Sequence, residues 1–187
     1  MQIGKLDRKV IDKNIDKIKE ADIILMQLEI PLDTIEYICG IASDKILILD
    51  PAPATNKIAD NMLSKINIIK PNETELSILT NLPTTNLEEI KIAGQQLLSR
   101  GVQNVIVSLG EKGAILINKE KTQIFPSIKN KVVDTTAAGD SFIAAITLAI
   151  SKNKTIEESI EFGNKVASFT VGKKGAQKSI PSLEELV

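Results

Sequence analysis

The sequence contains no histidine and no tryptophan, and it has a single cysteine, Cys39. Without histidine, Ser-His-Asp and Cys-His catalytic groups are excluded, and so are most zinc sites. One cysteine excludes an internal disulfide and is typical of a reducing compartment. Because Cys39 lies in an apolar pattern with helical spacing, we expect a buried thiol and not a nucleophile.

Aromatic residues and clustered charge are also scarce. Aromatics make up 3% of the chain and the net charge is −1, so neither stacking platforms nor a basic patch for nucleic acid is expected. No apolar run approaches the roughly 20 residues that cross a bilayer, and the N-terminus is charged and unlike a signal peptide. We therefore expect a cytoplasmic protein with no nucleic-acid or membrane partner.

Short apolar segments alternate with helical patterns over most of the 187 residues. Such alternation is typical of an α/β fold, with a doubly wound, mostly parallel sheet and helices on both faces. The length suits one domain, which we place over residues 1–187. Buried strands are predicted at 21–27 and 45–49, and further strands at 66–69, 104–108, 114–118 and 123–126. Helices are predicted at 32–42, 55–63, 73–79, 87–98 and 156–170, and residues 1–20 also show helical spacing.

The most informative stretch runs from Asp134 through Thr-Thr-Ala-Ala-Gly to Asp140. An apolar run that includes Ile128 and Val133 leads into it as a strand or loop, and a helix follows whose first turn is Ala-Ala-Gly-Asp. Small residues at a helix start leave backbone N–H groups open to an anion such as a phosphate in transfer, which the helix dipole also favours. Asp140 could take a proton from an attacking hydroxyl. An ordinary capped helix fits the same spacing.

Two further segments suggest a nucleotide site. Asn72 and Glu75 lie three apart at a helix start, where they could form a capping box or orient Mg²⁺-bound water and phosphate oxygens. Ser108-Leu-Gly-Glu-Lys-Gly113 places two glycines in a turn between strands, which any tight turn would require. No segment has the spacing of a Walker A loop.

Three motifs in register resemble the ribokinase-like (PfkB) carbohydrate kinases: Asp134–Phe142, Lys70-Pro-Asn-Glu-Thr-Glu75 and Lys174-Gly-Ala-Gln-x-Ser-x-Pro181. Many members carry Gly-Ala-Gly-Asp where this chain has Ala-Ala-Gly-Asp. The resemblance covers about residues 21–181. Members begin with further strands, a β lid and a Gly-Gly segment for the sugar, and these have no counterpart before Ala21. The resemblance thus implies the C-terminal, nucleotide-binding part of the family fold.

The activity implied by the resemblance is ATP-dependent phosphorylation of D-ribose to ribose 5-phosphate, with Mg²⁺ and a monovalent cation, K⁺. Asp140 would be the general base and contact the substrate, the amides of Ala137, Ala138 and Gly139 would form the anion hole, and Glu29 would bind sugar hydroxyls. The implied nucleotide contacts are Asn72, Glu75, Ser108, Gly110, Glu111, Gly113 and Asn164. The implied cation site is Asp134, Thr136, Thr170, Lys173, Gly175 and Ser179.

Several alternatives stay open at this point. Asn164 could be a helix-surface residue, Glu29 a solvated carboxylate, and Gly175–Pro181 a plain helix-capping turn. The chain could bind nucleotide or merely fold without catalysis, since the sugar segment and lid are missing. Another sugar or a nucleoside could be the acceptor. A sheet edge left open by missing strands would favour a homo-oligomer.

Overall fold

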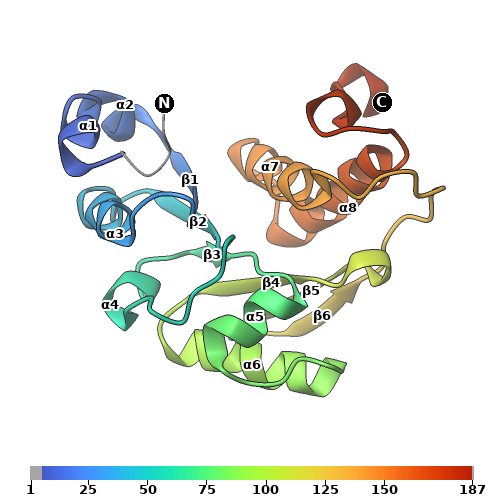
Figure 1. Cartoon of the computed structure of the whole chain (residues 1–187), viewed down its shortest axis with the longest axis horizontal. Coiled ribbons are helices and arrows are strands. Elements are labelled where there is room, and N and C mark those ends of the chain that lie inside the picture. The colour runs from blue at the N-terminus through green and yellow to red at the C-terminus, as the bar shows by residue number, and fades with distance from the viewer. Residues whose placement is uncertain (1–5, 187) are drawn as a thin grey trace. The chain divides into compact units, whose positions relative to one another are not determined.

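The computed structural model describes residues 6–186 as alternating strands and helices (Figure 1). The chain divides into two compact units: unit 1 is Met1–Val107 with Leu116–Thr122, and unit 2 is Ser108–Ile115 with Gln123–Val187. The single domain over residues 1–187 stays a prediction.

Within residues 6–186, six strands form one sheet in the order β1-β2-β3-β4-β5-β6. Their bounds are β1 Ile23–Gln27, β2 Ile46–Asp50, β3 Ile68–Ile69, β4 Asn104–Ser108, β5 Ala114–Asn118 and β6 Thr122–Phe125. β1 to β4 pair in parallel, with Gln27 opposite Asp50. The connections into β5 and β6 are too short for a parallel crossover, so these strands run antiparallel. The sheet is therefore mixed and mostly parallel, and every predicted strand is present.

The described residues of unit 1 form the helices α1 Arg8–Asp12, α2 Ile15–Glu20, α3 Leu32–Ile41, α4 Asp60–Leu63, α5 Glu73–Thr80 and α6 Leu87–Ser99. Helices α3 to α6 connect successive neighbouring parallel strands. Since such crossovers are right-handed, these helices lie on one face of the sheet, as Figure 1 shows. Leu47, Leu49 and Ile69 are fully buried in the core beneath them. Gly101, with φ +103°, follows the end of α6 as predicted.

Two predictions about local structure need correction. The segment 21–27 is a strand, but it is not a buried one: only Met26 of β1 is buried, and Leu25 is 39% exposed. The reason is that β1 is the last strand at one side of the sheet formed by residues 6–186. The helix predicted at 55–63 begins only at Asp60. For the apolar run Ile128–Val133, where a strand or a loop was open, the structure has an exposed loop.

Unit 2 is built around two long helices, α7 Ala138–Ser151 and α8 Ile156–Val171, with short 3-10 turns η2 Gly110–Lys112, η3 Gln177–Ser179 and η4 Glu184–Leu186. A Cβ atom on Gly163 would lie 2.8 Å from the Phe142 ring, so the missing side chain allows α7 and α8 to pack closely. Ala145, Val166 and Leu186 form a buried apolar cluster in this unit.

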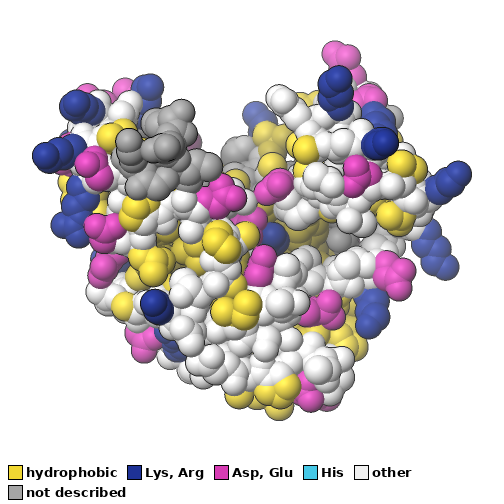
Figure 2. All heavy atoms as spheres, in the orientation of Figure 1, with side chains coloured by type: hydrophobic (Ala, Val, Ile, Leu, Met, Phe, Trp, Pro, Cys, Tyr) yellow, Lys and Arg dark blue, Asp and Glu magenta, His cyan; other side chains and the backbone are white. Residues whose placement is uncertain are grey.

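The surface gives few functional signals by itself. On the face shown in Figure 2, Lys and Arg side chains are interspersed with Asp and Glu. Among residues 6–186, no helix is both long enough and apolar enough to cross a membrane. Cys39 is buried, as predicted, and burial raises the pKa of its thiol to about 11, which makes it unreactive.

Candidate functional site

In unit 1, the turn after β3 carries Asn72 and Glu75 at the start of α5. Asn72 Oδ1 accepts a hydrogen bond from the Glu75 amide, and Glu75 Oε2 accepts one from the Asn72 amide, both at 2.8 Å. The predicted capping box is therefore present. It engages one carboxylate oxygen of Glu75, and within the described chain no donor contacts the other, Oε1. Two oxygen-bearing side chains held at the carboxyl end of a strand suit a hard cation with its bound water.

An ion pair that sequence reasoning missed lies just before this turn. Lys70 Nζ is 3.1 Å from Asp50 Oδ1, and the two side chains are only 5% and 3% exposed. Gln27 Nε2 donates to Asp50 Oδ2 at 3.3 Å. Opposite charges at the ends of two successive apolar strands were the signal that could have indicated this pair, because the ends of parallel strands meet at one edge of a sheet.

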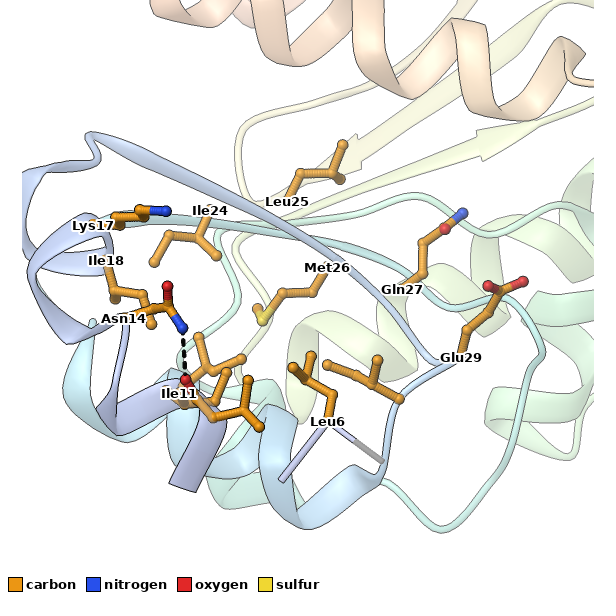
Figure 3. A pocket seen from close by; sticks show the side chains of 13 residues that line it. Leu6, Ile11, Asn14, Lys17, Ile18, Ile24, Leu25, Met26, Gln27 and Glu29 are labelled. Atoms are coloured by element: carbon orange, nitrogen blue, oxygen red, sulfur yellow. Dashed lines mark hydrogen bonds between the residues drawn. The ribbon is translucent and has the colours of Figure 1, made fainter. Parts of the chain in front are cut away.

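Glu29 follows β1 and is exposed. It lies at one end of a cavity of about 630 Å³ that is formed by α1, α2 and β1 and lined mainly by apolar side chains. Figure 3 shows the polar groups of Glu29 and Gln27 set apart from the apolar side chains of Ile11 and Ile18. An apolar lining does not suit sugar hydroxyls, so this cavity does not support a sugar site, and the role of Glu29 stays a prediction.

In unit 2, the turn between Ser108 and Gly113 has the two glycines in conformations that other residues rarely adopt. Gly110 has φ +58° and Gly113 has φ +98°. A Cβ atom on Gly113 would lie 2.0 Å from the Phe125 carbonyl oxygen, whereas the space at Gly110 is open. The carbonyl of Glu111 accepts a hydrogen bond from Ser127 Oγ. The predicted structural role of the glycines is confirmed, and their contact with a nucleotide stays a prediction.

The start of α7 provides backbone donors in unit 2. Ala137 precedes the helix in the left-handed conformation, with φ +62°, and the helix begins at Ala138. Left-handed and right-handed residues in succession turn their N–H groups toward one concave side, an arrangement that binds anions. The Ala138 amide donates to the Thr135 carbonyl at 3.2 Å. The amides of Ala137 and Gly139 have no acceptor among residues 6–186.

Asp140 lies in the first turn of α7 and is exposed. An exposed carboxylate at this position can accept a proton from a bound hydroxyl. The structure therefore places the predicted base and two of the three predicted anion-hole amides within one helical turn. Only the amide of Ala138 is engaged elsewhere, by the turn that leads into the helix.

Asp134 is held by hydrogen bonds in the turn before α7. Its Oδ1 accepts from the Thr136 hydroxyl at 2.6 Å and the Thr136 amide at 2.9 Å, and Oδ2 accepts from the Gly175 amide at 3.0 Å. The hydroxyl of Thr136 has the largest effect, and with the two amides it lowers the pKa of Asp134 to about 2. Three residues of the predicted cation site, Asp134, Thr136 and Gly175, are thus in direct contact.

The other three residues of that predicted site have partners of their own. The Thr170 carbonyl accepts from the Lys173 amide at 3.2 Å, and the Lys173 ammonium is 2.6 Å from Glu185. The Ser179 hydroxyl donates to the Ala176 carbonyl at 2.6 Å. Residues 6–186 contain no cluster of three or more His, Cys, Asp or Glu that could hold a metal. A cation site here would depend on backbone carbonyls and the single carboxylate of Asp134.

Asn164 lies in α8 and is only 7% exposed, so it is not a helix-surface residue. Its Nδ2 donates to the carbonyls of Phe125 and Pro126, both at 3.1 Å, and so fixes the segment after β6 against α8. This anchoring role explains a polar residue inside an apolar helix. A contact between Asn164 and a nucleotide stays a prediction.

In comparisons with known proteins, the chain matches carbohydrate kinases. The family described as pfkB family carbohydrate kinase matches residues 3–183. A ribokinase of Staphylococcus aureus is 40% identical over 174 residues, which are 91% of this chain and 57% of that protein. A deoxyribokinase of Salmonella typhi is 33% identical over 177 residues, which are 94% of this chain and 58% of that protein.

A solved structure of Arabidopsis thaliana ribokinase, complexed with ribose and ATP, superposes with a TM-score of 0.88 at 36% identity. The match covers 94% of this chain and 57% of that one, so the chain spans less than three fifths of these relatives. The ribokinase-like α/β fold class is thereby confirmed. The chain belongs to the pfkB family of carbohydrate kinases.

Proposed function

We propose that this chain is the part of an ATP-dependent sugar kinase that binds the nucleotide and contains the catalytic Asp140. The acceptor of this kinase is D-ribose. The observation that carries the proposal is the start of α7. There the amides of Ala137 and Gly139 have no acceptor among residues 6–186, and Asp140 lies in the first turn of the helix. The comparisons support the proposal in two ways. Relatives are named ribokinases, and the structure of one of them was solved with ribose and ATP.

In the proposed reaction, Asp140 takes the proton of the acceptor hydroxyl while the oxygen attacks the γ-phosphorus of ATP. The new O–P bond forms as the bond from the γ-phosphorus to the bridging oxygen breaks, and ADP leaves with that oxygen. The Ala137 and Gly139 amides stabilise charge on the transferring group. Phosphoryl transfer depends mainly on such positioning and charge stabilisation, which small-residue helix starts provide.

The remaining site residues take binding roles in the proposal. Asn72 and Glu75 would hold Mg²⁺, which would supply neutralisation of the phosphate charge. The ionised Asp134, with its pKa of about 2, suits a monovalent cation such as K⁺ held together with backbone carbonyls. Glu29 binds the sugar, and the nucleotide is contacted by Ser108, Gly110, Glu111, Gly113 and Asn164. The other cation ligands are Thr136, Thr170, Lys173, Gly175 and Ser179.

The first prediction concerns Asp140→Asn. Ribose-dependent ADP formation with Mg²⁺ and K⁺ should fall by about 10² to 10⁴, since a positioned general base contributes about that much, while ATP binding is kept. Asp33→Asn is the matched control because Asp33 also lies in the first turn of a helix and is exposed. Turnover by Asp140→Asn at the level of the Asp33→Asn control would remove Asp140 from the role of base.

A second candidate function is nucleotide binding without turnover. It is the alternative to compare because the chain spans 57–58% of the two named relatives, so the whole protein's activity is not established for the chain itself. ATP binding by the wild-type chain with no ADP formation would select this candidate. The deoxyribokinase relative also makes 2-deoxyribose the first alternative acceptor to assay beside D-ribose.

A further inference from the structure

The buried pair Asp50–Lys70 in unit 1 has no role in the function proposed above. Its two side chains are almost fully enclosed, and the Nζ to Oδ1 distance is 3.1 Å. Removing two charges from water is costly, and apolar residues of similar size often give equal or greater stability. A buried ion pair at this position therefore needs an explanation other than stability.

The pair links the carboxyl ends of neighbouring strands. Asp50 is the last residue of β2 and lies opposite Gln27, the last residue of β1. Gln27 Nε2 donates to the carboxylate of Asp50, and Lys70 follows directly after β3. The backbone adds a second tie, because the Lys70 amide donates to the Leu49 carbonyl at 2.9 Å.

Each member of the pair is followed by a proline, Pro51 or Pro71, and both prolines are buried. Proline fixes its own φ and restricts the residue before it, so the chain leaves each strand in a set direction. After Pro71 comes Asn72, the first member of the capping box with Glu75. Only one residue, the rigid Pro71, separates Lys70 from Asn72, so the position of Lys70 limits the position of Asn72.

We propose that Asp50 and Lys70 are a positioning pair, which fixes the ends of β2 and β3 so that Asn72 and Glu75 present their oxygens to a metal–phosphate group. The inference rests on the metal role proposed above for Asn72 and Glu75. Asp50 and Lys70 act through these two residues and do not touch the ligand themselves.

The decisive variant is the double substitution Asp50→Asn with Lys70→Met, which removes the tie without leaving an unpaired buried charge. The control is Glu88→Gln with Lys91→Met, which removes an ion pair whose side chains are 78% and 34% exposed at the start of α6. Two quantities are measured for wild type and both variants. One is amide hydrogen exchange without ligand, and the other is affinity for a non-hydrolysable ATP analogue with Mg²⁺ and with EDTA.

We expect the amides of Asn72 and Glu75 to exchange at least about tenfold faster in the double variant, because their capping bonds open more often. The affinity gained on adding Mg²⁺ should fall at least about fivefold, the lower end of ordinary coupling between two ligands. Affinity in EDTA should be unchanged. The control variant should match wild type in amide exchange, in affinity with Mg²⁺ and in affinity with EDTA. A purely stabilising pair would lower thermal stability without this selective loss.

Three results would overturn the inference. Unchanged exchange at Asn72 and Glu75 would show that the pair does not hold the turn, and would leave the proposed function intact. Weaker binding in EDTA would indicate that Lys70 contacts the nucleotide directly. A wild-type chain whose affinity does not respond to Mg²⁺ would remove the metal role itself, and the positioning role with it.

Discussion

Asp134 and Asp140 lie six residues apart at the start of α7, and their surroundings differ. Asp134 accepts three hydrogen bonds from Thr136 and Gly175, which keep it ionised and tie two loops of unit 2 together. Asp140 is exposed in the first turn of the helix. Two carboxylates with different environments can take different roles, one structural or cation-binding and one chemical.

The pKa of Asp134 predicts a pH-dependent contribution to stability. The pKa of about 2 in the folded protein lies below the ordinary value of 3.8. The ionised carboxylate therefore stabilises the fold at pH values above 3.8, and this contribution is lost as the pH falls toward 2. Wild type should therefore be more stable than Asp134→Asn near neutral pH, with the difference shrinking below about pH 4. Urea denaturation of both proteins at several pH values measures this difference.

Taking the difference between the two proteins is essential here. Hydrogen bonds also lower the pKa of Glu89, Glu158 and Glu185, so the whole chain loses stability in acid. These residues are common to both proteins and their effects cancel in the comparison. A difference that stays constant from neutral pH to about pH 2 would contradict the assignment of the low pKa to Asp134.

At the residue scale, local patterns could be predicted and long-range partners could not. The Asn72–Glu75 capping box and the turn glycines follow from spacing, because their hydrogen bonds join residues three or four apart. The Asp50–Lys70 pair joins residues twenty apart, and the amide of Asn164 reaches Phe125 in another element. Such contacts depend on strand register and helix packing, which the sequence alone does not specify.

At the scale of elements, the turn between β4 and β5 depends on one glycine far more than on the other. Gly113 has φ +98° and ψ −126°, a region that only glycine adopts readily, and backbone atoms of Phe125 and Ser127 fill the space beside it. Gly110 has φ +58° with nothing within 4 Å of a Cβ atom. The two positions therefore form a matched pair for substitution by alanine.

Gly113→Ala should lower the free energy of unfolding by more than about 3 kcal/mol or prevent folding, since strain and a backbone clash add together. Gly110→Ala should cost about 1 kcal/mol, the price of a left-handed alanine. Chemical denaturation monitored by circular dichroism measures both. Equal effects of the two substitutions would show that the turn does not pack against the segment after β6 as described.

The strands and helices could be predicted from apolar period and helix-start residues, whereas burial could not be predicted for every strand. β1 has the continuous apolar sequence of a buried strand, yet Leu25 is 39% exposed. An apolar sequence predicts a strand with buried side chains, but it does not specify which of these side chains are covered by other residues of the chain. β1 is an edge strand among the described residues, and its unpaired side is where the homo-oligomer considered from the sequence would form.

At the scale of the whole chain, the family is established, whereas the acceptor is not. The family match spans residues 3–183, and the chain covers less than three fifths of relatives such as the Staphylococcus aureus ribokinase. The fold class followed from the alternation of strands and helices, and the family from motifs of a few residues each. Neither observation identifies the acceptor, so phosphoryl transfer to D-ribose is a proposal that assays must test.

The most direct test of the central claim is an NMR titration of the ¹⁵N-labelled chain with a non-hydrolysable ATP analogue and Mg²⁺. If the start of α7 binds phosphate, the amide signals of Ala137 and Gly139 should shift downfield and saturate together, while adenosine, which lacks phosphates, should leave both unchanged. A folded chain in which the analogue moves neither signal would contradict the claim that this turn is the phosphate-binding element.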